Sequence, residues 1–204
     1  MEHRIMQLVL ATQNKDKIRE IKNLLADLPV EIKTCDDFDN FPDIEETGET
    51  LEDNAVLKAK GIAAHTGLPA LADDSGLEVE YLDGRPGVYS SRFAGPGCTY
   101  DDNNRKLLEE LKNVSEDQRG ARFRTVIAVA WNEKDIELAE GVADGIITKE
   151  KSGRDGFGYD PVFYFPPAGK TFAEMTLEEK NKVSHRGKAL LKARELLKKR
   201  LVID

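Results

Sequence analysis

Hydrophobic positions in the first third of the chain follow two alternating periods. Residues 5–11 form a nearly continuous apolar run, which is typical of a strand covered on both faces. A polar turn follows, and apolar residues then recur at helical spacing over 18–28. A second strand is predicted at 30–34, an acidic loop at 35–47, and a helix that starts on a capping box at 50–65.

The same two periods predict the later elements. In chain order they are a buried strand at 69–77, a half-exposed strand at 77–82, a helix at 101–113, a strand at 121–131, antiparallel strands at 136–148 and a helical pattern at 176–201. Glycine and proline residues punctuate the aromatic residues of 153–167, which suggests an ordered loop that presents rings. Because helices interleave with strands early and strands cluster in the middle, an α/β fold with a mixed sheet is predicted.

Composition narrows the class of protein. A chain of 204 residues suffices for one folding unit. The formal net charge of −8 argues against a nucleic-acid polymer as partner, because such binders usually carry a basic face. Cys35 and Cys98 lack metal-ligand spacing, and two reduced thiols fit a cytoplasmic protein. The apolar run at 5–11 is too short to span a membrane, so no membrane partner is expected.

Two adjacent acids, Asp73 and Asp74, interrupt the apolar run at 69–77, which is interpreted as a strand that ends by delivering carboxylates to a sheet edge. Successive strand side chains point to opposite faces, so the two acids share a direction only if the strand has already ended. Such carboxylates suit Mg²⁺, which binds oxygen ligands beside substrate phosphates. An Asp-Asp-Ser-Gly turn explains the same residues equally well, and both interpretations stay open.

Three charged segments admit either an ionic site or an ordinary explanation. Residues 12–17 offer backbone N–H groups and Lys17 to a phosphate, although this pattern taken alone is more often an ordinary capped helix start with solvated lysines. The acids at 45–49 could complete a metal site with Asp74 or form a solvated loop. Lys58, inside the second predicted helix, is interpreted as a surface charge rather than a phosphate contact.

Two segments could recognise a planar base. Phe157, flanked by glycines, offers a ring face for stacking, although a ring beside so many other aromatics is more typical of a core. His185 and Arg186 fall where the last helical pattern is interrupted, and both can donate hydrogen bonds to a carbonyl or phosphate oxygen. A lone His-Arg pair on a helix is usually exposed, so neither segment decides the function alone.

Six segments taken in order carry a resemblance. They are Thr12-x-Asn14-x-x-Lys17, Glu45-Glu-Thr-Gly48, Ala72-Asp-Asp-Ser-Gly-Leu77, Pro86-Gly87-x-x-Ser90-x-Arg92, Phe157-Gly-Tyr-Asp-Pro161 and Ser184-His-Arg186. Together they closely resemble the inosine/xanthosine triphosphate pyrophosphatase family, from the first strand to the last helix.

The resemblance implies an enzyme that cleaves the purine nucleoside triphosphates ITP, dITP and XTP to the monophosphate and pyrophosphate. It implies Mg²⁺ as cofactor, a homodimer, and an elongated mixed α/β fold whose two lobes flank a central nucleotide cleft. Asp74 would be the catalytic base and a metal ligand, Glu45 a further metal ligand and Ser75 a substrate contact. The triphosphate would be held by Thr12, Gln13, Asn14, Lys15, Asp16 and Lys17. The base would be surrounded by Phe157, Gly158, Tyr159, Asp160, Lys180, His185 and Arg186.

Discrimination between bases would follow from the 6-position of the purine. A buried donor from Arg186 or His185 pairs with a keto oxygen, whereas adenine presents an amino group there. Leaving such a donor unpaired costs about 1–3 kcal/mol. Guanine shares the keto oxygen, so its rejection must come from the 2-position.

Two alternatives belong to other classes. A nucleotide-binding regulatory module would use the same residues without turnover, although the acids Glu45 and Asp74 argue for catalysis. An aspartyl-phosphate phosphatase needs its nucleophilic acid directly after the first strand, where this chain has Ala11 and Thr12.

Overall fold

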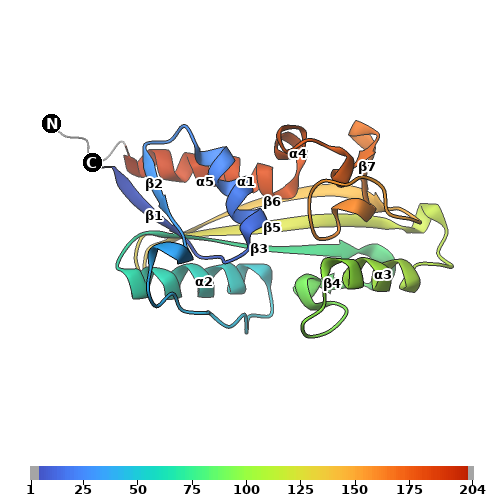
Figure 1. The fold of residues 1–204 in the computed structure, drawn as a ribbon, viewed down its shortest axis with the longest axis horizontal. Helices are drawn as coiled ribbons and strands as arrows, with labels where there is room; N and C mark the ends of the chain where they lie inside the picture. The colour runs from blue at the N-terminus through green and yellow to red at the C-terminus, as the bar shows by residue number, and fades with distance from the viewer. Residues whose placement is uncertain (1–4, 202–204) are drawn as a thin grey trace. The chain divides into compact units, whose positions relative to one another are not determined.

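The structure is a computed structural model, and it describes residues 5–201 (Figure 1). The helices are α1 (Lys15–Leu25), α2 (Leu51–Thr66), α3 (Tyr100–Glu110), α4 (Leu177–Val183) and α5 (His185–Leu201). The strands are β1 (Met6–Leu10), β2 (Val30–Lys33), β3 (Ala70–Val79), β4 (Pro86–Gly87), β5 (Gly120–Ala130), β6 (Ile136–Ile147), β7 (Phe163–Phe165) and β8 (Lys170–Thr171). The predicted α/β class is confirmed.

Within residues 5–201 the strands form one eight-stranded mixed sheet in the order β2-β1-β3-β5-β6-β7-β8, with β4 paired to β3. β1 lies parallel to both β2 and β3, whereas β7 lies antiparallel to β6 and β8. β5 and β6 are neighbours joined only by residues 131–135. So short a connection is a hairpin, because a parallel pair needs a longer crossover. The antiparallel strands predicted over 136–148 are one long strand, β6.

The chain divides into two compact units, and each has its own hydrophobic cluster. The first unit takes in the described residues up to Asp74, then Thr125–Gly141, and the described residues from Lys188 onward. The second unit comprises Ser75–Arg124 and Val142–Gly187. The boundary falls inside β3, β5 and β6, so each of these strands contributes residues to both units.

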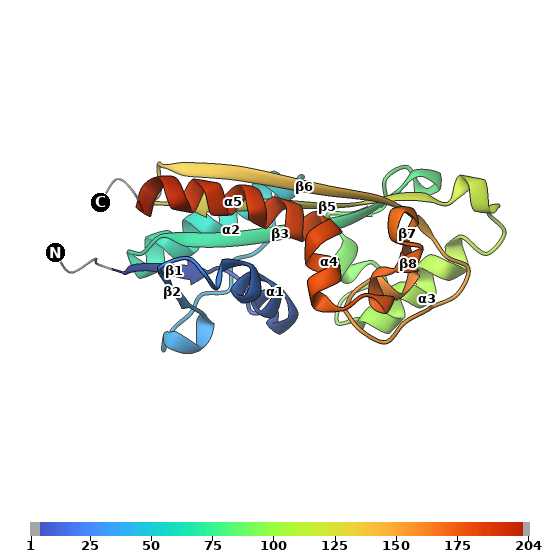
Figure 2. The same cartoon turned by 90° about the horizontal axis from the view of Figure 1, so that it is seen from above.

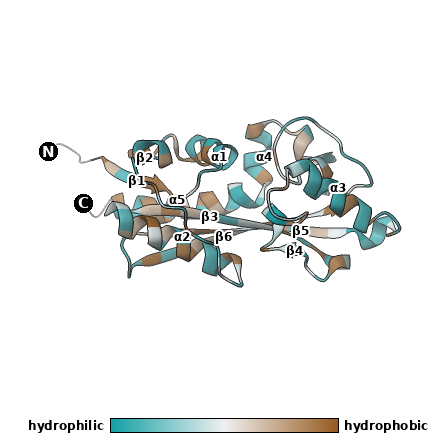
Figure 3. Ribbon diagram, turned by 60° about the horizontal axis from the view of Figure 1, so that its bottom comes forward, coloured by the Kyte–Doolittle hydropathy of each residue, from teal (hydrophilic) through white to brown (hydrophobic). Residues whose placement is uncertain are grey.

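In the first unit, helices cover both faces of the sheet (Figures 1 and 2). α1 and α5 pack on one face, where Ile21 and Leu190 join the cluster formed by Leu8 and Leu10 of β1. α2 covers the opposite face. α2 carries both hydrophobic and hydrophilic residues (Figure 3), and its buried side is formed by positions that include Ala55, Ala59 and Ile62. This double cover explains why β1 reads as a continuous apolar run.

In the second unit, aromatic rings fill the core. The ring of Phe123 lies 4.6 Å from that of Phe163 and 6.0 Å from that of Phe172. The predicted ring-presenting loop at 153–167 is thus only partly right, because Phe163 and Phe165 belong to β7 and are buried. These rings cluster because the segment folds back as a strand instead of remaining a surface loop.

A buried arginine connects two segments of the second unit through hydrogen bonds. Arg119 is 1% exposed, and its guanidinium group donates hydrogen bonds to the carbonyl oxygens of Leu111 at 2.6 Å, Ile147 at 2.7 Å and Thr148 at 2.6 Å. Burial lowers the pKa of Arg119. The side chain thereby ties the residue after α3 to the end of β6.

No helix within residues 5–201 is both long enough and apolar enough to cross a membrane. The single-domain organisation expected from chain length stays a prediction, since the two compact units neither require nor exclude it.

Candidate functional site

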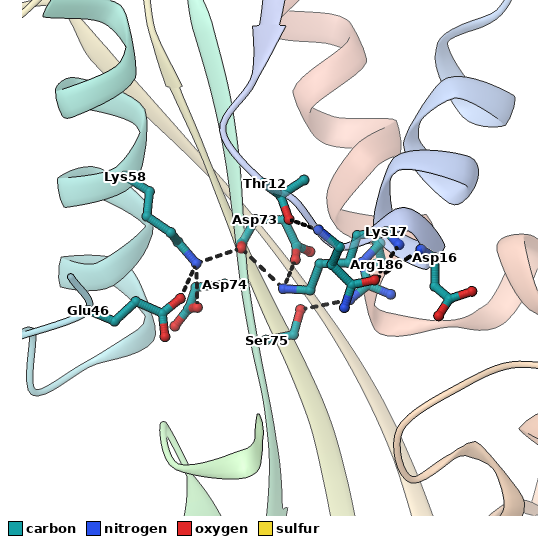
Figure 4. A network of polar contacts seen from close by, with 10 residues as sticks. Thr12, Asp16, Lys17, Glu46, Lys58, Asp73, Asp74, Ser75 and Arg186 are labelled. Atoms are coloured by element: carbon teal, nitrogen blue, oxygen red, sulfur yellow. Dashed lines mark hydrogen bonds and ion pairs between the residues drawn. The ribbon is translucent and has the colours of Figure 1, made fainter. Parts of the chain in front are cut away.

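β3 carries both acids in mid-strand, and both are buried. The prediction that the strand ends there is wrong, because β3 continues to Val79. Side chains of a continuous strand alternate between faces. Asp73 therefore pairs with Lys17 of α1 on one face, while Asp74 pairs with Lys58 of α2 on the other (Figure 4).

Lys58 is the centre of the group on the α2 face. It is 9% exposed, and its ammonium group donates hydrogen bonds to the carboxylates of Glu46 and Asp74, both at 2.7 Å, and to the Asp73 carbonyl oxygen at 2.9 Å. These three acceptors use all three ammonium protons. The interpretation of Lys58 as a surface charge is therefore wrong.

Burial sets the proton affinity of this group. It raises the pKa of Asp74, and the opposing positive charges of Lys58 and Lys17 do not cancel that increase. Burial alone would lower the pKa of Lys58, but the attraction of Asp74 and Glu46 outweighs it, so that pKa is raised as well. The lysine stays charged, and the carboxylate gains the proton affinity that a general base needs.

The acid that shares the Lys58 ammonium group with Asp74 is Glu46 rather than Glu45. Glu45 is exposed, so its assignment as a metal ligand stays a prediction. No group of three or more His, Cys, Asp or Glu side chains suited to a metal occurs within the described part of the chain. The donor chemistry of Glu46 and Asp74 nevertheless fits Mg²⁺, which is commonly held by one or two carboxylates together with substrate phosphates.

The segment 12–17 connects β1 to α1 and caps the helix. The Asn14 side-chain oxygen accepts hydrogen bonds from the backbone N–H groups of Asp16 at 3.0 Å and Lys17 at 3.2 Å, and Thr12 Oγ1 accepts one from the Asn14 N–H at 3.2 Å. The exposed side chains of the segment are Gln13 and Lys15. The capped helix start is confirmed. Phosphate binding by this segment stays a prediction, with Lys17 as its cation.

Four of the predicted base-site residues lie together in the second unit. The buried Asp160 carboxylate accepts hydrogen bonds from the Phe157 N–H at 2.8 Å and from the Lys180 ammonium at 2.6 Å. The Lys180 Nζ lies 4.7 Å from the centre of the Phe157 ring, and the Arg186 guanidinium carbon lies 5.2 Å from it. Both distances are typical of cation–π contacts, so this half-buried ring lies in a positive environment.

Two other predicted base contacts pack into the second unit's interior. Tyr159 is 4% exposed, its hydroxyl donates a hydrogen bond to the Ser90 carbonyl oxygen at 2.9 Å, and burial raises its pKa. His185 is 3% exposed and stacks on Phe123, with ring centroids 4.3 Å apart and planes inclined by 9°. The contact of Tyr159 with a base stays a prediction, while the Phe157 ring, for which a core position was the alternative, is half-buried.

The break between α4 and α5 determines where Arg186, in the first turn of α5, lies. Ser184 is extended, and α5 begins at His185, which confirms the predicted interruption. A Cβ atom at Gly187 would lie 1.9 Å from the Asn181 carbonyl oxygen, so only glycine allows this approach. Arg186 donates a hydrogen bond to the Ser75 hydroxyl at 3.1 Å, which joins two predicted substrate contacts (Figure 4).

The sequence named Glu46 only among the acids at 45–49 and assigned the metal to Glu45, and it misjudged Lys58, although a signal existed. Lys58 lies three residues after Ala55 and four before Ile62, on the buried stripe of α2. A lysine on such a stripe needs buried acceptors, which Asp74 and Glu46 supply. The spacing could thus have directed attention to it.

The protein has a mixed α/β fold in which β3 carries a buried acid–lysine pair on each face of the sheet. In its second unit, two cationic side chains lie over one aromatic ring. The chain belongs to the Ham1 family, because the model of that family matches residues 8–196.

Relatives match over nearly the full length. The dITP/XTP pyrophosphatase of Thermoanaerobacter sp. (strain X514) is 50% identical over 196 residues, covering 96% of this chain and 98% of that protein. The dITP/XTP pyrophosphatase of Desulforamulus reducens is 52% identical over 192 residues, covering 94% and 96%. Among solved structures, a HAM1 protein from Coxiella burnetii has a TM-score of 0.87 at 44% identity and covers 95% of this chain and 99% of its own.

Proposed function

We propose that this protein is a nucleoside triphosphate pyrophosphohydrolase that cleaves the non-canonical purine nucleotides ITP, dITP and XTP and so removes them from the nucleotide pool. The names of the relatives support the reaction, since proteins about half identical over nearly the whole chain are dITP/XTP pyrophosphatases. The single structural observation that carries it is the buried Asp74 carboxylate, held by Lys58 beside a second acid, Glu46.

In this reaction water attacks the α-phosphorus, the bond between the α- and β-phosphates breaks, and the monophosphate and pyrophosphate leave. Asp74 accepts the proton of the attacking water, which its raised pKa favours. Lys58 orients the Asp74 carboxylate through their 2.7 Å hydrogen bond. Lys17, at the start of α1, supplies positive charge to the leaving pyrophosphate.

A divalent cation, here proposed to be Mg²⁺, belongs to the same reaction. Glu46 and Asp74 would hold it, with Glu45 as the alternative acid. When bound, it would offset phosphate charge and lower the pKa of water. In the structure Lys58 bonds to both of these carboxylates, so a bound cation would compete with its ammonium group for their oxygens.

Base recognition is proposed to use the second unit. Phe157 offers a ring for stacking, and Lys180 and Arg186, which lie over that ring, are positioned as donors. A 6-keto purine accepts from such donors, whereas adenine opposes them with its amino group. The nucleotide partner is thus a keto purine triphosphate. The homodimer and the cytoplasmic location stay predictions.

Product identification tests the reaction. The protein is incubated with Mg²⁺ and ITP, XTP, dITP, GTP or ATP, and the products are separated by ion-exchange chromatography. Monophosphate and pyrophosphate from ITP and XTP are expected, with much slower turnover of ATP and GTP. Orthophosphate with a nucleoside diphosphate would contradict the proposal, and tight XTP binding without turnover would favour a regulatory module.

Asp74→Asn tests the base. Loss of a general base is expected to lower kcat by about a hundredfold or more, because the amide cannot take up the proton. Nucleotide binding, measured by isothermal titration, should be largely retained. Near-normal kcat would place the base elsewhere.

A further inference from the structure

α3 lies against the Phe157 segment, although none of its residues enters the proposed chemistry. Asn104 of α3 is 2% exposed, and its Nδ2 donates hydrogen bonds to the carbonyl oxygens of Gly158 at 2.7 Å and Tyr100 at 3.0 Å. Both partners are acceptors only, so they fix the orientation of the amide. Among the described residues, Asn104 Oδ1 has no hydrogen-bond partner.

This arrangement is costly unless the bond to Gly158 has a use. A leucine would fill a similar volume without burying an unpaired oxygen. Asparagine at this position can instead hold a carbonyl of the aromatic segment, which leucine cannot. Asn104 therefore links that segment to α3, in addition to bonding within the helix to Tyr100.

The contacts of Asn104 and Asp160 hold the backbone around Phe157. Asp160 accepts from the Phe157 N–H, and Asn104 donates to the carbonyl oxygen of the next residue, Gly158, whose φ is +61°. A second α3 residue meets the ring itself, since the Tyr100 ring centroid lies 5.9 Å from that of Phe157 with the planes inclined by 43°. α3 thus contacts the Phe157 ring and the backbone of the following residue, Gly158.

The plane of the Phe157 ring matters because a stacked base adopts it. Lys180 and Arg186 lie 4.7 Å and 5.2 Å from the ring centre, so a tilt of the ring changes where a stacked purine edge meets these donors. Misplaced donors bind a keto oxygen less well, whereas an amino group, which they do not favour, loses little.

We propose that Asn104 is a positioning residue for base selectivity: it fixes the Phe157 ring plane through Gly158, and Tyr100 supports the ring from the side. The proposal rests on the proposed function, because it assigns a further determinant to the same base site.

Asn104→Leu tests it, with Asn103→Leu as the matched control. Asn103 is also 2% exposed on α3, but its amide contacts the Ala94 N–H at 2.7 Å and the Ser91 carbonyl oxygen at 3.2 Å, away from the Phe157 segment. Asn104→Leu is expected to raise the KM for XTP about tenfold, to leave kcat within about threefold, and to lower the XTP-to-ATP ratio of kcat/KM by about tenfold.

Inhibition by added pyrophosphate provides a readout that a general loss of structure would disturb. It should be the same for wild type and Asn104→Leu, because pyrophosphate has no base. Asn103→Leu should leave both the XTP-to-ATP ratio and pyrophosphate inhibition at wild-type values.

A wild-type XTP-to-ATP ratio in folded Asn104→Leu, or an equal loss of ratio in Asn103→Leu, would overturn the inference. Should circular dichroism show that Asn104→Leu does not fold, Tyr100→Ala replaces it, since that side chain is 42% exposed. Its ratio should fall in the same direction, and an unchanged ratio would overturn the inference. Wild-type protein that releases no pyrophosphate from XTP would overturn the proposed function itself, and the inference with it.

Discussion

At the scale of single residues, the neighbouring acids Glu45 and Glu46 differ in environment. The Glu46 side chain is 28% exposed and is bonded to the buried Lys58, whereas Glu45 is exposed. A cation held at Asp74 would compete with Lys58 for the same oxygens. Glu46 is therefore the acid expected to respond to the cation.

Addition of Mg²⁺ without nucleotide is expected to raise the melting temperature, and Glu46→Gln should lose most of that increase. A cation at about a hundred times its Kd stabilises the folded state by about 2.7 kcal/mol, which is several degrees for a chain of this size. Differential scanning fluorimetry measures the shift. Glu45→Gln is the matched control and should keep it. A shift lost in Glu45→Gln and kept in Glu46→Gln would instead support Glu45 as the ligand.

Residue contacts were the least predictable part of the site. The ordered motifs identify Asp74 and the Phe157 segment, because those residue types recur together in the resembled family. They do not reveal that Lys58 joins Asp74 to Glu46, which depends on how α2 is rotated against β3. The contacts of Arg119 could not be predicted either. Its partners include the backbone carbonyl oxygens of Ile147 and Thr148, and every residue type has such an oxygen.

At the scale of elements, the start of α4 combines two hydrogen bonds in a capping box. Thr176 Oγ1 accepts from the Glu179 N–H at 3.2 Å, and the Glu179 carboxylate accepts from the Thr176 N–H at 2.8 Å. The second bond, together with Lys170, lowers the pKa of Glu179 below its usual value of 4.5. Because the folded-state pKa is depressed, this stabilisation is present above pH 4.5 and is lost as pH falls below it.

Glu179→Gln is therefore expected to lower the melting temperature at pH 7 and to differ less from wild type at pH 4. Thr176→Ala provides the control, because it removes a cap worth about 0.5–2 kcal/mol without removing a charge. Its cost should depend less on pH than that of Glu179→Gln, because the Thr176 side chain is only a minor cause of the lowered Glu179 pKa. Thermal unfolding followed by circular dichroism measures both. A Glu179→Gln difference that is unchanged or larger at pH 4 would contradict the linkage.

Elements were more predictable than contacts, for a physical reason. Helical spacing and capping residues act within a few positions, so α2, α3 and the break before His185 follow from the sequence alone. The length of β3 does not, because its acids look like a strand end until buried lysines are known to neutralise them. Long-range partners decide that case.

At the scale of the whole molecule, neither compact unit is one continuous stretch of chain. Each has its own hydrophobic cluster, but β3, β5 and β6 pass from one unit into the other within single strands. Unfolding one unit would remove ladder partners from strands that continue into the other. We therefore expect the protein to unfold in one cooperative transition.

Phe163→Ala tests this cooperativity with a reporter in the other unit. Phe163 is fully buried in the second unit, and its truncation should cost about 3–5 kcal/mol. Trp131, the only tryptophan, lies beside the first unit's cluster. If unfolding is cooperative, urea midpoints from Trp131 fluorescence and from far-ultraviolet circular dichroism should coincide in wild type and fall together in the variant.

Leu25→Ala, in the first cluster, is the control and should move both midpoints as well. A Trp131 midpoint that stays at its wild-type value in Phe163→Ala while the dichroism signal splits into two phases would mean that the units unfold separately.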